Sequence, residues 1–315
     1  MRWRVALGLA IVILLPSFSN VNWGFPSSSQ IERAYNFLIS LYNPNLGLVC
    51  ESYEAPFNTT YWIYSDNLIV SYALAPYSPY YSKIINETVR RYMVKAGVGM
   101  SHKFEVLFGY DIPDTILSSN VYVIDDHGDY VIKIDRADGE PLRVEDYADL
   151  CFYKALDCYF EGEIDGAKHY FEIGYNMFDG VGFYDKATEE DGLYANYKLA
   201  LCIYTAKVLG LSKEEYPALD IMERQLWEAQ NERGGIITHR DLEGNLVGLA
   251  NAETTALTLL IYNDELIRSL NPNLNEGNNW GLAQYFEIGI FIGLVLWCLY
   301  KWLFKVLSAR SRWHL

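Results

Sequence analysis

The chain has 315 residues, of which 40 are acidic and 25 basic, so its formal net charge is −15 at pH 7. This acidity excludes nucleic acid as a partner, because phosphate groups would repel the chain. Hydrophobic residues make up 51% of the sequence, which is enough for a large core and excludes disorder of the whole chain.

The first residues are typical of a signal peptide. Arg2 and Arg4 precede an apolar run over residues 5–15, and small or polar residues follow Pro16. The run of about 11 residues is shorter than the roughly 20 that a spanning helix needs. We therefore predict a signal peptide over residues 1–19, with an uncleaved signal anchor as the alternative.

A predicted domain over residues 20–281 is mostly helical. Periodic apolar side chains predict helices over 27–42, 65–75, 79–95, 145–159, 164–178, 192–209, 213–230 and 250–262. Between about 102 and 135 the pattern changes to β-branched and aromatic runs. These predict an extended stretch over 104–108 and a β-hairpin that pairs 120–124 with 130–134.

The segment 282–304 is long and apolar enough to cross a bilayer, and we predict a transmembrane helix there. Basic side chains at its end and beyond place the tail, residues 305–315, in the cytoplasm; they are Lys301, Lys305, Arg310 and Arg312. The expected location is the cell membrane, with a single pass and the bulk of the chain outside the cytoplasm. A helix lying in the membrane interface is the alternative.

A weak internal repeat relates the starts of every second predicted helix. The four starts are Tyr64-Ser65-Asp66, Tyr147-Ala148-Asp149, Tyr194-Ala195-Asn196 and Leu249-Ala250-Asn251. Glycine turns with a short extended stretch precede three of them. Each unit, of roughly 45 residues, is interpreted as a helical hairpin.

This order of outer helix, glycine-rich turn, short strand and inner helix resembles the (α/α) toroid of the six-hairpin glycosidase-like superfamily. The run over 230–260 carries most of the resemblance. The expected fold class is mainly α: a toroid-like array of about four helical hairpins with a small β-hairpin insertion, plus one C-terminal transmembrane helix. The resemblance implies that a funnel at the start of the inner helices binds glycans.

Polar side chains at the starts of the inner helices would converge in such a funnel. Asp66, Asp149 and Glu253 are the candidate acid and base for cleavage of a glycosidic bond. The candidate substrate-binding residues lie beside the same helix starts and are Trp62, Tyr64, Tyr194, Asn196, His239 and Asn251. Helix capping and aromatic packing explain the same residues without any substrate.

Other chemistry has no motif in the sequence. Phosphate loops, dinucleotide fingerprints and HExxH runs are absent, so no cofactor or metal is expected. Cys50 and Cys202 form a conceivable disulfide, and buried free thiols are the alternative.

Two functions remain. The first is a membrane-anchored cell-surface domain that binds or processes glycans, which predicts an acidic cleft with Tyr and Trp at its rim. The alternative is a non-catalytic scaffold that binds another envelope protein, which predicts an exposed apolar patch. The sequence leaves open whether the protein is an enzyme.

Overall fold

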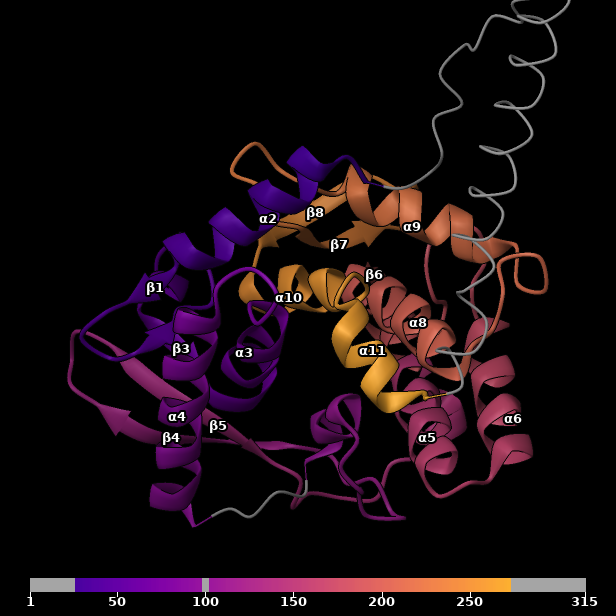
Figure 1. Cartoon of the computed structure of the whole chain (residues 1–315), viewed down its shortest axis with the longest axis horizontal. Coiled ribbons are helices and arrows are strands. Elements are labelled where there is room, and N and C mark those ends of the chain that lie inside the picture. The colour runs from indigo at the N-terminus through magenta and orange to yellow at the C-terminus, as the bar shows by residue number, and fades with distance from the viewer. Residues whose placement is uncertain (1–25, 98–101, 273–315) are drawn as a thin grey trace, which may run out of the picture. The chain divides into compact units, whose positions relative to one another are not determined.

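The computed structural model describes residues 26–97 and 102–272 (Figure 1). The chain divides into two compact units, Met1–Asn263 and Asp264–Leu315. Within its described residues, the second unit contributes the short helix α11 (Asp264–Leu270).

Paired helices build most of the first unit. Its α-helices are α2 (Ser28–Ser40), α3 (Ile69–Ala73), α4 (Pro79–Ala96), α5 (Ala148–Phe160), α6 (Ile164–Tyr175), α7 (Lys186–Asp191), α8 (Asn196–Leu209), α9 (Ala218–Glu228) and α10 (Ala252–Leu260). Helices α3, α10, α8 and α5 neighbour one another in that order. Each also packs against an outer helix, which is α4, α2, α9 and α6 respectively (Figure 1).

Burial separates the inner helices from the outer ones. Helices α8 and α10 are buried around almost their whole circumference, as expected for helices that are apolar on every side. The outer helices α2 and α9 bury a single stripe and face solvent on the other side. The side chain of Ser27 caps α2 and forms a capping box with Gln30, so the predicted helix start is confirmed.

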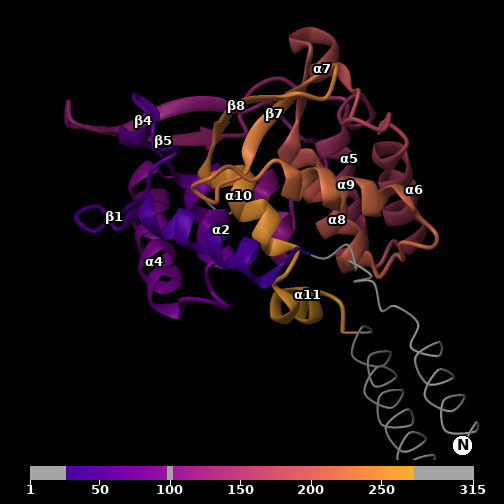
Figure 2. The ribbon, with the colours of Figure 1, turned by 90° about the horizontal axis from the view of Figure 1, so that it is seen from above.

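The described residues of the first unit also form three small sheets. The first sheet pairs β1 (Tyr42–Asn43) with β2 (Leu48–Val49). The second contains, in spatial order, β3 (Thr60–Trp62), β5 (Val131–Arg136) and β4 (Asn120–Asp126). The third contains, in spatial order, β6 (Leu193–Ala195), β7 (Ile237–Asp241) and β8 (Leu246–Ala250). Figure 2 shows β4, β5, β7 and β8 along one side of helices α2, α8 and α10. The short helical turns are η1 (Phe57–Thr59), the π-helical η2 (Ile63–Leu68), η3 (Lys103–Phe108) and η4 (Val144–Asp146).

The expected fold class, a mainly α toroid-like array with a single β insertion and a C-terminal transmembrane helix, is wrong in its β structure. The described residues contain three sheets, because β3 joins the predicted hairpin in parallel and β6 joins β7 and β8. No helix of the described residues is long and apolar enough to cross a membrane. The predicted signal peptide (1–19), transmembrane segment (282–304) and tail (305–315) lie outside the described residues.

Two local predictions also need correction. The segment expected to be extended over 104–108 is the 3-10 helix η3, because His102 and Glu105 form a capping box around its start. The conceivable disulfide is not formed. Within the described ranges the four cysteines, Cys50, Cys151, Cys158 and Cys202, are buried free thiols.

Candidate functional site

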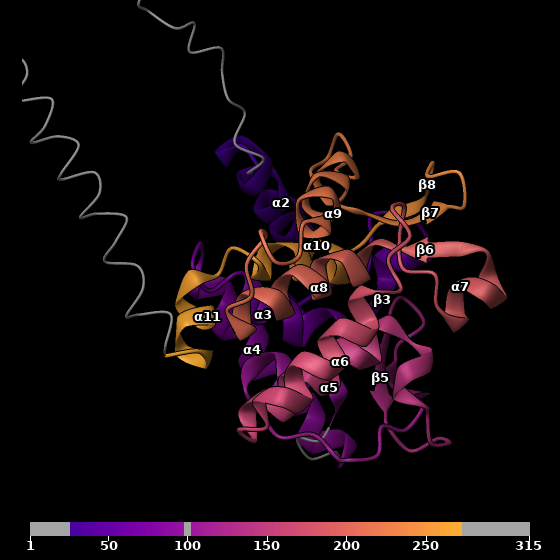
Figure 3. The ribbon, with the colours of Figure 1, turned by 90° about the vertical axis from the view of Figure 1, so that its right-hand side faces the viewer.

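Helices α3, α8 and α10 begin at the side of the unit where the two three-stranded sheets lie. Strand β3 runs directly into η2 and α3, β6 runs into α8, and β8 runs into α10. Figure 3 shows β3, β5, β6, β7 and β8 gathered on the same side of α3, α8 and α10. The first residues of these helices are thereby brought to one region of the surface.

A pocket of about 300 Å³ opens in this region, and we call it the acidic cleft. Four carboxyl side chains line it: Glu51 from the loop before β3, Asp66 from η2, Asp135 from β5 and Glu253 from α10. The remaining lining residues are Trp62, Ser65, Lys103, Phe104, Ser119 and Asn251. Four of the nine residues predicted for the site, Trp62, Asp66, Asn251 and Glu253, therefore share one pocket.

Hydrogen bonds fix the wall formed by Trp62. Its indole Nε1 donates to Oε2 of Glu51 over 2.8 Å. The backbone of Glu51 bridges two elements, since its N–H donates to the carbonyl of Thr60 and its carbonyl accepts from the N–H of Ala252, both at 2.9 Å. The Nζ of Lys133 lies 4.9 Å from the centroid of the Trp62 ring, a cation–π contact. These contacts hold the side chain of Trp62 in position without a bound ligand.

Asp66 lies in the π-helical turn that opens α3, a distortion often found at functional sites. Its side chain is 2% exposed, and its Oδ2 has no hydrogen-bond partner among the described residues. Burial raises the pKa of Asp66 well above its usual range, and the nearby carboxyl of Glu253 raises it further. The neutral form of Asp66 is therefore favoured relative to that of an exposed carboxyl group.

Glu253 and Asp135 differ in charge state at neutral pH. Burial raises the pKa of Glu253 to about 8, with a further contribution from Asp135. Burial also raises the pKa of Asp135 to about 6, and the positive charge of Lys103 opposes this rise. At pH 7 Glu253 is thus mostly a neutral acid and Asp135 mostly a carboxylate, which are complementary states for proton transfer.

Asp149 lies close to the cleft without lining it. It belongs to the first turn of α5, is 7% exposed, and its Oδ2 accepts a hydrogen bond of 3.2 Å from the hydroxyl of Tyr197. Its charge is one of the contributions that raise the pKa of Glu253. The buried hydroxyl of Tyr153 has no hydrogen-bond partner within the described part of the chain. Asp149 therefore influences the cleft through its charge.

The two predicted tyrosines pack in the core. Tyr64 is 1% exposed and stacks on His102 with 4.8 Å between ring centroids. Tyr194 is 4% exposed, and its hydroxyl donates to Asp179. Neither ring reaches the acidic cleft. Both tyrosines are therefore packed in the core, as the alternative of aromatic packing without a substrate predicted.

The remaining predicted residues have structural partners. Asn196 donates from Nδ2 to the carbonyl of Ile237 over 2.8 Å, and His239 lies on β7, next to β6, where burial lowers its pKa. Neither residue lines the cleft. Asn251 does line it, and its Oδ1 also accepts the N–H of Thr254 over 2.9 Å, which confirms helix capping there.

Sequence reasoning missed Glu51, Lys103 and Asp135. The parallel pairing of β3 with β5, with Trp62 opposite Lys133, brings Asp135 beside the start of η2. Its side chain and that of Asp66 both hydrogen-bond with Ser65. The alternation of the predicted hairpin indicated two strands but gave no sign of a third strand from a distant segment.

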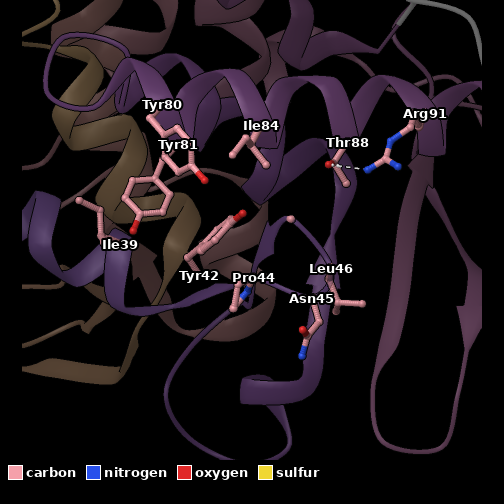
Figure 4. Close-up of a pocket in the computed structure, with 11 residues that line it drawn as sticks. Ile39, Tyr42, Pro44, Asn45, Leu46, Tyr80, Tyr81, Ile84, Thr88 and Arg91 are labelled. Atoms are coloured by element: carbon pink, nitrogen blue, oxygen red, sulfur yellow. Dashed lines mark hydrogen bonds between the residues drawn. The ribbon is translucent and has the colours of Figure 1, made fainter.

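A second pocket, of about 560 Å³, lies between α4 and the turn that joins β1 to β2. Figure 4 shows Tyr42, Tyr80 and Tyr81 around it and Arg91, which donates to Thr88 over 2.9 Å. Arg91 is the single charged residue among those that line it. Because this pocket has no carboxyl group and none of the predicted site residues, the acidic cleft is the candidate site.

A scan against protein-family models matches no family, and a search of curated proteins finds no match. Among the described residues, no group of three or more His, Cys, Asp or Glu side chains is arranged to hold a metal ion. Function is therefore inferred from the shape and charge of the acidic cleft.

Proposed function

We propose that the acidic cleft binds a glycan and hydrolyses a glycosidic bond by general acid–base catalysis. The observation that carries this proposal is that Glu253 and Asp135 line one open pocket in different protonation states, beside the ring of Trp62. Paired carboxyl groups whose pKa values are separated by their surroundings are the arrangement that this reaction uses.

The two carboxyl groups take different roles. Glu253, protonated at neutral pH, donates its proton to the glycosidic oxygen as the bond to the sugar breaks. Asp135, ionised at the same pH, either attacks the sugar carbon or takes a proton from the attacking water. Trp62 offers an amphipathic ring for a sugar face. Burial keeps Glu253 protonated, and the negative charges of Asp135 and Asp149 add to this effect, since they disfavour a further carboxylate nearby.

The test is turnover of neutral oligosaccharides, measured as new reducing ends. We expect Glu253→Gln and Asp135→Asn each to lower the rate by at least about 100-fold, the usual contribution of an acid or base. Tyr80→Ala is the matched control, because Tyr80 is 67% exposed and lines the other pocket. Circular dichroism checks the fold of each variant. Turnover that survives both carboxyl substitutions would contradict the proposal.

A specific observation favours the second candidate function, a scaffold for a protein partner. Strand β4 is an edge strand, and it exposes Val121 by 54%, Tyr122 by 39% and Val123 by 55%. An exposed apolar edge strand is a template for strand addition by another chain. A photo-crosslinker at position 121 tests this. Capture of one defined protein, lost when Val123→Lys is added, would support the scaffold; no adduct would count against it.

A further inference from the structure

We propose that the acidic cleft takes a sugar ring with a free primary amine, bound in its ammonium form. This inference rests on the proposed function and narrows its substrate class. Four carboxyl side chains line the cleft, and Lys103 is the single basic residue among the lining residues. An amino sugar brings the positive charge that this lining lacks.

The charge balance of the cleft favours one added cation. The lining combines four carboxyl groups with one basic side chain, that of Lys103. Burial raises the pKa of Glu51, and the hydrogen bond donated by the indole N–H of Trp62 opposes this rise. One added ammonium group would offset negative charge of these carboxyl groups, whereas an acidic sugar would increase the repulsion.

A buried oxygen in the lining supports a ligand with several donors. Oδ2 of Asp66 has no hydrogen-bond partner among the described residues, although the side chain is 98% buried. A buried polar atom without a partner costs free energy, so a donor that reaches it is stabilised. An ammonium group carries three N–H donors and no acceptor, which suits a lining rich in oxygen atoms.

Two other kinds of cation fit less well. A metal ion needs several ligand atoms around one point, and no group of three or more His, Cys, Asp or Glu residues in the described ranges has that arrangement. A lysine side chain of a peptide supplies an ammonium, but it would leave the indole of Trp62 without a ring to contact. The amine of a sugar places the charge and an apolar ring face in the same small ligand.

The same groups make binding dependent on pH. The titratable and charged side chains that face the cleft from every element around it are Glu51, Asp66, Lys103, Asp135 and Glu253, with Lys133 and Asp149 behind its walls. A bound ammonium favours the carboxylate form of Glu253. Binding at pH 7.5 should therefore release protons, a quantity that calorimetry in two buffers of different ionisation enthalpy measures.

The experiment compares three oligosaccharides on the whole chain by calorimetry at pH 6.5: a glucosamine tetramer, its N-acetylated form and cellotetraose. We expect the glucosamine tetramer to bind at least about tenfold more tightly than the other two. Raising the salt concentration from 0.05 to 0.5 M should reduce the preference. Asp66→Asn should weaken binding of the glucosamine tetramer several-fold.

Glu87→Gln is the matched control, because it removes one carboxylate from the exposed face of α4 and leaves the cleft intact. Equal affinity for the acetylated tetramer would overturn the inference, and its hydrolysis would still support the proposed function. A preference for the glucosamine tetramer with no cleavage of any oligomer would support the inference and contradict hydrolysis. Equally tight binding of trilysine would overturn the sugar class.

Discussion

The pKa of Glu253 makes the stability of the protein depend on pH in a direction that can be measured. Its folded-state pKa is about 8, against an ordinary value of 4.5, so the native state retains a proton that the unfolded chain has lost. Stability falls as pH rises wherever the native state binds more protons. The contribution of Glu253 is thus fully present below pH 4.5 and is lost as the pH rises to about 8.

Glu253→Gln should remove this dependence. One proton corresponds to about 1.4 kcal/mol per pH unit, so between pH 5.5 and 7.5 the wild type should lose about 2.5 kcal/mol of unfolding free energy that the variant keeps. Because Glu253 reaches the open cleft, solvent screening lowers the expected difference to about 1.5–2.5 kcal/mol.

Urea unfolding at the two pH values measures this difference, with midpoints and slopes compared between the two proteins. Glu243→Gln is the control, because Glu243 is exposed and should leave the pH dependence of the wild type unchanged. The reasoning is refuted if Glu253→Gln and the wild type lose the same free energy between pH 5.5 and 7.5. Such a result would mean that Glu253 is already ionised at pH 5.5 and is not the proton donor.

Three further predictions concern packing. Lys198→Met should cost about 3–5 kcal/mol of stability in thermal or urea unfolding, because Lys198 and Asp185 form a buried ion pair of 2.6 Å and Asp185 would lose its partner. Gly182→Ala should cost about 1–3 kcal/mol in the same assay, since its Cβ would lie 2.4 Å from the ring of Tyr194. The four described cysteines should react with a thiol reagent only after unfolding; fast reaction of the native protein would contradict their burial.

The periodic helices were predictable, and the pairing of distant strands was not. Apolar spacing located every outer and inner helix because each buries a stripe or its whole surface. Strand β8, residues 246–250, was not predicted, because its role depends on pairing with β7. A strand of three residues such as β3 has no pattern of its own, and its parallel partner lies about 70 residues further along the chain.

The sequence predicted those residues of the acidic cleft that lie at the starts of inner helices. Asp66 and Glu253 were found because they open inner helices, and these helices begin beside one another. Glu51 and Asp135 belong to a loop and to a strand end, so only tertiary contacts place them in the cleft. Tyr64 and Tyr194 have the same sequence context as Trp62, and burial alone separates the core rings from the cleft ring.

Helix capping and burial in the cleft predict opposite shifts in the pKa of a carboxyl group at a helix start. Capping and the helix dipole stabilise the ionised form by about 0.3–1 kcal/mol, and by roughly 2 kcal/mol in favourable cases, which would lower a pKa. The pKa of Glu253 is instead raised from 4.5 to about 8, equivalent to about 5 kcal/mol in favour of the protonated form. Burial therefore outweighs the dipole at the start of α10. Asn251, which is neutral, supplies the cap there, and this leaves Glu253 available as an acid.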